Sequence, residues 1–349
     1  MRHRNIPIFI PHMGCPNQCV FCNQRSISGC RAFREEGVRE QIEVALSTIP
    51  SEDEVEIAFF GGSFTGIERG LMLRLLDTAQ AYVEGGQVKS IRLSTRPDYI
   101  DGEILKILSR YAVKDIELGL QSMNDEVLSC AKRGHTAQCA REACRAVVDA
   151  GFALTGQMMI GLPASTRERE LMTAREIAAL GARAVRVYPT VVLADTPLCD
   201  MMKSGEYTPL TIEEAVSRSA DVLEYFESVQ IPCIRTGLCA TEELSLPHAV
   251  CGGANHPALG EMVLGELAYR RIVALLESEG LLGAEVLIEV PVREVSRTVG
   301  YKRANIERFF AQLHTRVRVR GKDTDHITLT RLTLPNIQTG GTDFVPEIT

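Results

Sequence analysis

The sequence contains no tryptophan, and aromatic residues make up only 5% of its 349 residues. Surfaces that stack nucleic-acid bases depend on aromatic side chains, so this composition gives little support for such a surface. The formal net charge of −7 also argues against a broad nucleic-acid footprint. No apolar run reaches the length of about 18 residues that a membrane-spanning helix needs, so we expect no membrane partner.

The N-terminus lacks the long apolar segment and the small-residue cleavage site of an export signal. We therefore expect a cytoplasmic protein. In a reducing compartment, its eleven cysteines favour metal ligation or free thiols over disulfides. Hydrophobic residues make up 45% of the chain, which is ordinary for a globular protein with a sizeable core.

Three of the cysteines form a close group. Cys15, Cys19 and Cys22 have the spacing C-x3-C-x2-C directly after a short apolar run. A structural zinc ion normally takes four protein ligands, and a 4Fe–4S cluster is usually held by four cysteines. Three thiolates therefore predict a cluster with one iron left open to a small molecule. The alternative is a zinc site completed by a distant Cys or His.

This triplet, with Phe21 just before its last cysteine, resembles the signature of the radical S-adenosylmethionine (SAM) superfamily. The resemblance implies that Cys15, Cys19 and Cys22 hold a 4Fe–4S cluster whose open iron binds the methionine end of SAM. It also implies reductive cleavage of SAM to a 5′-deoxyadenosyl radical. A flavodoxin- or ferredoxin-type protein is then the expected electron donor.

Apolar segments alternate with helical patterns over about 190 residues, which predicts βαβ units and a parallel sheet. The expected strands are 6–11, 55–60, 90–94, 115–120, 152–160 and 184–188. The expected helices between and after them are 37–47, 71–82, 101–109, 136–150, 166–180, 213–229 and 261–278. The superfamily resemblance makes this a partial (β/α)6 TIM-type barrel of the α/β class. Its active site is expected at the carboxyl ends of the strands.

From Glu285 onward, the pattern of strands and helices differs from the regular alternation before it. Residues 286–292 and 326–332 read as strands, and residues 296–313 read as a helix. We therefore expect a radical SAM barrel over residues 1–240. A small α/β extension over residues 241–349 is expected to pack on it.

The motif GGSF follows the second expected strand and contributes Gly61, Gly62 and Ser63. Two glycines allow close approach of the backbone to a ligand. A tight turn explains the pair equally well. Within the superfamily, the glycine pair at this place contacts the amino group of SAM, and the resemblance implies the same role here.

Further polar side chains lie at or near strand ends. Ser94 is expected to bond SAM or to cap its strand, and Gln121 carries an amide that can donate and accept. Arg133 is expected to pair with the methionine carboxylate, or else to be an exposed residue at a helix start. Gln157 lies in an apolar strand, where a buried amide needs partners such as ribose hydroxyls.

The motifs FFGGSFTG, STRPDYI, ELGLQSMNDEVL, KRGHT, GQMMIGLP and HPALGE together resemble the radical SAM domain of the Elongator catalytic subunit, and more closely its short bacterial relatives. The resemblance covers residues 6–271. It implies that the residues of the SAM pocket named above act together, with Tyr188 at the barrel mouth. The Elongator subunit also has an acetyltransferase domain, and we expect none in this chain.

These features predict an enzyme that uses a radical to abstract hydrogen from a substrate, with tRNA as one candidate. The alternative is a non-catalytic iron–sulfur or zinc protein that binds RNA or a protein partner. The enzyme is favoured, because a binding protein that has lost its chemistry would not need a complete SAM pocket. That pocket is represented here by Gly61, Gly62, Gln121 and Arg133. Cys233, Cys239 and Cys251 are close enough in sequence for a second metal site, but buried or incidental thiols explain them better.

One feature of the C-terminal extension is independent of the resemblance. In a strand over residues 315–322, Arg316, Arg318 and Arg320 would share one face, while Val317 and Val319 would pack inward. Such a basic stripe suits the docking of a phosphate-bearing substrate. A solvated edge strand protected by charge is the slightly favoured alternative.

Overall fold

The computed structural model describes residues 3–10, 13–15, 19–23, 33–238, 246 and 248–332. Their contacts divide the chain into two compact units, Met1–Gly260 and Glu261–Thr349. The domain boundary that the sequence suggests at residue 240 stays a prediction.

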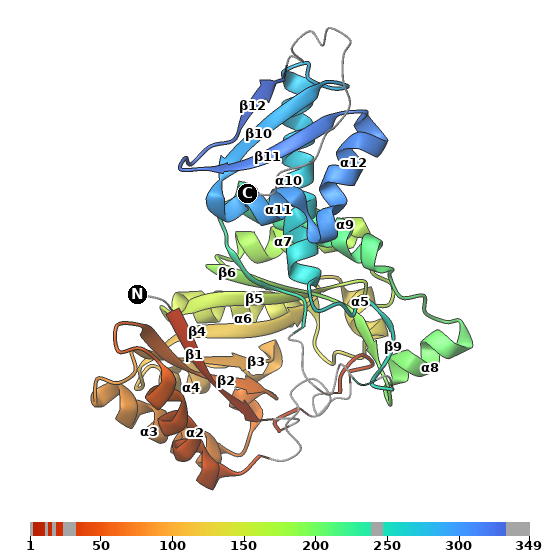
Figure 1. Cartoon of the computed structure of the whole chain (residues 1–349). Coiled ribbons are helices and arrows are strands. Elements are labelled where there is room, and N and C mark those ends of the chain that lie inside the picture. The colour runs from red at the N-terminus through yellow and green to blue at the C-terminus, as the bar shows by residue number, and fades with distance from the viewer. Residues whose placement is uncertain are drawn as a thin grey trace, which may run out of the picture. The chain divides into compact units, whose positions relative to one another are not determined.

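A seven-stranded parallel sheet with the order β1-β2-β3-β4-β5-β6-β8 forms the first unit. Helices follow most of its strands, and Figure 1 shows β4, β5 and β6 lying side by side. The strands are β1 His3–Ile10, β2 Glu54–Gly61, β3 Ser90–Thr95, β4 Val113–Gln121, β5 Ala153–Ile160, β6 Ala184–Pro189 and β8 Cys233–Thr236. This confirms the expected α/β partial barrel and adds β8 to it.

Most helices of the first unit begin at side-chain caps that satisfy open N–H groups of the first turn, and α2 is an exception. Thr136 caps α6, Thr166 caps α7, and Thr211 forms a capping box with Glu214 at α9. The helices are α2 Val38–Thr48, α3 Arg69–Glu84, α4 Gly102–Leu108, α5 Asp125–Cys130, α6 Ala137–Asp149, α7 Arg167–Ala179, α8 Pro197–Ser204 and α9 Ile212–Ser228.

In several strands, polar residues alternate with buried apolar ones. In β4, Ile116, Leu118 and Leu120 are fully buried, whereas the alternate positions hold Glu117 and Gly119. Parallel sheets covered on both faces usually have apolar residues throughout their strands. Because successive side chains point to opposite faces, a polar inner face marks the interior of this half-barrel as the place for polar chemistry.

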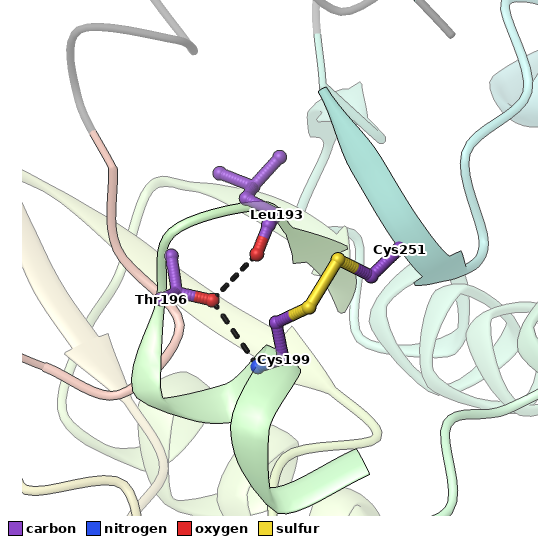
Figure 2. The surroundings of a disulfide bond; sticks show 4 residues. All are labelled: Leu193, Thr196, Cys199 and Cys251. Atoms are coloured by element: carbon purple, nitrogen blue, oxygen red, sulfur yellow. Dashed lines mark hydrogen bonds between the residues drawn. A yellow bond between two sulfur atoms is a disulfide. The ribbon is translucent and has the colours of Figure 1, made fainter. Parts of the chain in front are cut away.

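Three elements beside the barrel were not expected from the sequence. The short helix α8 and the strand pair β7 Val191–Leu193 and β9 Val250–Gly253 lie after β6 in the chain. Cys199 of α8 forms a disulfide with Cys251 of β9, with 6.2 Å between their Cα atoms (Figure 2). The expectation of metal-bound or free thiols is therefore wrong for this pair.

The second unit contains a three-stranded sheet, β11-β10-β12, with β10 Glu285–Pro291, β11 Arg316–Lys322 and β12 Thr328–Arg331. Its helices are α10 Leu259–Ser278, which begins in the first unit, α11 Val295–Val299 and α12 Ala304–Leu313. The core of this unit includes Tyr269, Ile288 and Phe309.

The single helix expected over residues 296–313 is wrong. Gly300 has a φ of +79°, and Lys302 and Arg303 also have positive φ values, so the chain turns between α11 and α12. The amide of Asn305 explains the close turn, because its Nδ2 donates to the carbonyl oxygens of Gly265 and Arg297 at 2.8 and 3.2 Å. No helix among the described residues has the length and apolar content to cross a membrane.

Candidate active site

The loop that carries the cysteine triplet follows β1. Cys19 is buried, and Cys15 and Cys22 are half-buried. Between the last two cysteines, Val20 donates its N–H to the carbonyl of Ala131 at 3.1 Å, and its carbonyl accepts from Leu198 N at 2.9 Å. The backbone after Cys19 is therefore held from two sides, by residues distant in sequence.

No group of three or more Cys, His, Asp or Glu side chains in the described part of the chain is arranged to hold a metal ion. The ligand set of Cys15, Cys19 and Cys22 thus stays a prediction.

The GGSF loop contacts the backbone that leads into the triplet. Gly61 pairs with Ile10 of β1, and Gly62 donates its N–H to the carbonyl of Ile10 at 2.8 Å. Ser63 donates its N–H to the carbonyl of Met13 at 3.0 Å. A Cβ atom on Gly62 would lie 2.0 Å from that same carbonyl oxygen, so only glycine fits. The glycine therefore lets the cysteine loop approach β2.

Ser63 is fully buried, and its hydroxyl lies 2.8 Å from the hydroxyl of Thr95. Thr65 also contacts Thr95, at 2.7 Å. These three hydroxyls join the GGSF loop to the end of β3.

Three of the expected SAM-pocket residues meet around Gly119 of β4. A Cβ atom there would lie 2.8 Å from Arg133 Nη2, 3.0 Å from Gln121 Nε2 and 3.5 Å from Gln157 Oε1. Arg133 Nη2 donates to the Gly119 carbonyl at 2.6 Å, and Nη1 contacts Cys19 Sγ at 3.5 Å. The structure thus brings Arg133, Gln121 and Gln157 together next to one cysteine of the triplet.

Gln121 holds its position through an unusual backbone. The register of β4 against β5 shifts between Gly119 and Gln121, and Gln121 has a φ of +66°. A left-handed non-glycine residue costs about 1–3 kcal/mol and persists where the surroundings impose it. A bulge of this kind re-aims a side chain, here toward Gln157.

Ser94 and Tyr188 lie on the same polar face, at strands on either side of β4 and β5. Ser94 pairs in register with Glu117, whose Oε2 lies 2.8 Å from Arg186 Nε. Arg186 Nη1 also donates to the Tyr188 hydroxyl at 3.2 Å. Burial raises the pKa of Glu117, and the charge of Arg186 opposes that rise. Burial likewise raises the pKa of Tyr188.

Two buried arginines influence the pKa of the Cys15 thiol. Arg96 and Arg133 are 2% and 7% exposed, and their positive charges oppose the rise that burial gives to the pKa of Cys15. Arg96 Nη1, Arg133 Nε and His135 Nε2 are buried and lack a hydrogen-bond partner among the described residues. Burial lowers the pKa of His135 to about 4, and the positive charge of Arg133 is the second cause.

These features fit a 4Fe–4S cluster with SAM. Thiolates are the ligands that iron–sulfur clusters use, and the buried guanidinium N–H groups of Arg96 and Arg133 that lack an acceptor are suited to a negatively charged group. Cys15, Cys19 and Cys22 would hold the cluster, and the residues around Gly119 would hold SAM.

Sequence reasoning missed Arg96, Thr95, Glu117 and Arg186. A signal existed for two of them, because Glu117 and Arg186 are charged residues flanked on both sides by apolar ones, in DIELGL and AVRVY. His135 directly precedes the cap of α6, which is the hydroxyl of Thr136, accepting from Cys139 N at 3.2 Å.

The second cysteine group does not form as one set. Cys251 is bonded to Cys199 (Figure 2). Cys233 Sγ lies 3.5 Å from Thr236 Oγ1. Cys239 lies outside the described residues.

Residues 9–177 match the radical SAM superfamily, and residues 182–269 match the radical SAM C-terminal domain. The half-barrel, with the cysteine triplet after its first strand, agrees with both matches. The chain belongs to the radical SAM superfamily and is a radical SAM enzyme.

Within the superfamily, the chain is Elongator-like. The uncharacterized protein MJ0486 of Methanocaldococcus jannaschii is 29% identical over 232 residues, 63% of this chain and 71% of that protein. The tRNA uridine(34) acetyltransferase of the same organism is 28% identical over 232 residues, 60% of this chain and 42% of that protein. The chain thus spans less than half of the acetyltransferase.

Among solved structures, archaeal Methanocaldococcus infernus Elp3 with an N-terminal deletion aligns with a TM-score of 0.58 and 22% identity. The alignment covers 80% of this chain and 63% of that one. It shows a shared fold, and together with the sequence matches it confirms the resemblance to the Elongator subunit.

Proposed function

We propose that this enzyme binds a 4Fe–4S cluster through Cys15, Cys19 and Cys22 and cleaves SAM reductively. Held by these three thiolates, the cluster would supply the electron that cleaves SAM to a 5′-deoxyadenosyl radical, and this radical would abstract hydrogen from the substrate. The observation that carries the proposal is the convergence of Arg133, Gln121 and Gln157 around Gly119, beside Cys19.

Each residue of the candidate site has a defined task in this proposal. Arg133 is a cation that reaches both Cys19 and the pocket, so it can orient the methionine carboxylate. Gln121 and Gln157 supply amide donors and acceptors for ribose hydroxyls. Gly61, Gly62, Ser63 and Ser94 form the wall on the β2 and β3 side, and Tyr188 lines the barrel mouth.

The proposed substrate is tRNA. The name of one M. jannaschii relative, the tRNA uridine(34) acetyltransferase, supports this choice. The electron donor in the cell is proposed to be of the flavodoxin or ferredoxin type. We expect the enzyme to work in the cytoplasm.

The test is anaerobic reconstitution of the full chain with iron and sulfide. Wild type should hold about four irons per chain and, with dithionite, convert SAM to methionine and 5′-deoxyadenosine. The Cys15→Ala, Cys19→Ala and Cys22→Ala variants should each lose the iron and the visible absorption. Cys130→Ala is the matched control, because Cys130 is an exposed thiol of α5. Retention of the same iron in a triple variant of the three cysteines would overturn the proposal.

A further inference from the structure

Arg96 is a buried cation with an unused donor. It follows β3 directly, and its Nε and Nη2 donate to the two carboxylate oxygens of Asp98 at 2.9 and 2.7 Å. These two nitrogens form one edge of the guanidinium fork, so Nη1 lies on the edge away from Asp98. Nη1 is buried and has no hydrogen-bond partner in the part of the chain that the structure describes.

The surroundings of Arg96 connect it to the cysteine loop. Its backbone N–H donates to Ser63 Oγ at 3.2 Å, and the N–H of Ser63 donates to the carbonyl of Met13, two residues before Cys15. The charge of Arg96 interacts with both Cys15 and Cys19. A buried donor left without an acceptor costs about 1–3 kcal/mol, so an acceptor outside the protein would relieve a real penalty.

The charges around these thiols favour the reduced state of a cluster that the thiols would hold. Arg96 and Arg133 carry two positive charges, Asp98 carries one negative charge, and His135 is neutral at pH 7, since its pKa is lowered to about 4. A 4Fe–4S cluster with three thiolates has one net negative charge when oxidised and two when reduced. Buried positive charge therefore stabilises the reduced cluster more than the oxidised one.

We propose that Arg96 raises the reduction potential of the cluster, with Nη1 as a hydrogen-bond donor to the cluster's thiolates or sulfides. This inference rests on the proposed function. The step it concerns is the addition of one electron from a one-electron donor to the cluster, in which no bond forms or breaks. Net charge and hydrogen bonds to sulfur are recognised determinants of that potential.

The test is an EPR-monitored redox titration of the reconstituted full chain, with iron content measured in parallel. Arg96→Gln should keep its iron, while the ratio of reduced to oxidised cluster at the wild-type midpoint falls at least tenfold. A tenfold change corresponds to about 59 mV for a one-electron couple. Arg96→Lys retains the charge and should recover most of that change.

Two more variants separate charge from folding. Asp98→Asn removes the negative partner of Arg96 and should shift the midpoint in the opposite direction, toward easier reduction. Arg141→Gln is the matched control, because Arg141 makes the same two-bond ion pair with Glu176 at 2.8 and 3.0 Å, between α6 and α7. Its midpoint should equal that of wild type.

The outcomes are distinct. A wild-type chain that holds no iron overturns the proposed function and this inference together. A wild-type chain with a cluster whose midpoint is unchanged in Arg96→Gln overturns the inference alone. If Arg96→Gln cannot hold iron, Asp98→Asn decides: a midpoint that stays or falls contradicts the role of Arg96, and one that rises supports it.

Discussion

The side-chain amides of Gln121 and Gln157 exchange two hydrogen bonds, each of 2.8 Å, across β4 and β5. Each amide uses one donor and one acceptor for its neighbour and keeps the remaining capacity for another partner. The pair is therefore both rigid and able to bind polar groups. Its orientation depends on both members.

We predict that Gln157→Ala weakens SAM binding. The substitution leaves the buried amide of Gln121 without its partner, at a cost of about 1–3 kcal/mol, and it removes one contact with the ligand. Equilibrium dialysis of SAM against anaerobically reconstituted protein measures the loss. Gln138→Ala is the control, because Gln138 is exposed and donates to Glu142 of the same helix, α6. If Gln157→Ala binds SAM with wild-type affinity, the prediction is wrong and the glutamine pair has only a structural role in the barrel.

We predict that the stability of the apo chain falls between pH 6.5 and pH 4 because of His135. Burial lowers the pKa of this histidine in the folded chain to about 4, while in the unfolded chain it stays near 6.5. The unfolded state thus binds the proton first as pH falls. Stability is complete above pH 6.5 and decreases below it, by about 2 kcal/mol at pH 5.

Urea unfolding at pH 7.5 and pH 5 measures this loss. His135→Gln should remove most of the difference between the two pH values. His326→Gln should leave it intact, because the His326 side chain is 71% exposed. A pH dependence that survives in His135→Gln would show that another group causes it.

We predict that Cys199 and Cys251 resist alkylation until the denatured protein is reduced, as Figure 2 leads one to expect. The bond links positions 52 residues apart, and in the chain-entropy model such a loop is worth about 4 kcal/mol of unfolding free energy. Cys251→Ser should lose that stability under oxidising conditions, and Cys130→Ser should not. Alkylation of both thiols in protein denatured without reductant would contradict the bond.

We predict that the arginine stripe of β11 has little effect on RNA binding. Arg318 donates to Glu285 of β10 at 2.8 Å, and Arg320 is paired with Glu289, so neighbouring carboxylates offset much of the charge. Replacing Arg316, Arg318 and Arg320 with Gln should change the slope of log K against log salt for tRNA by less than about one.

Filter binding of tRNA at several salt concentrations measures that slope. A variant with Arg39, Arg110 and Arg145 replaced by Gln is the matched control, because these three arginines are exposed and lie on the first unit. A slope reduced by two or more in the stripe variant alone would restore the docking hypothesis.

The strands and most helices of the barrel were predictable, because an apolar face repeats along each of them. Ile116, Leu118 and Leu120 make β4 recognisable without any knowledge of its neighbours. The turn at Gly300 was not predictable in the same way, since the apolar pattern continues through it. It depends on the contact between Asn305 and Gly265, which are 40 residues apart.

The candidate site shows the same division. Gln121, Arg133 and Gln157 could be named from their motifs, and the structure brings them together. Arg96 could not be recognised, because its role depends on its burial and on the position of the cysteine loop. Neither property is visible in the letters STRPD.

The two backbone bonds of Val20 also bear on how the enzyme is made. A ribosome completes Cys15, Cys19 and Cys22 early, but Ala131 and Leu198, which hold Val20 in place, emerge much later. At about 5–20 residues per second, the interval between Cys22 and Leu198 is roughly 10 to 35 s. During that time the thiols are synthesised but not supported, so iron delivered to a growing chain would meet an unfinished loop. A cluster bound as proposed would therefore be inserted after translation of α8, so the cysteine loop would be made long before it could mature.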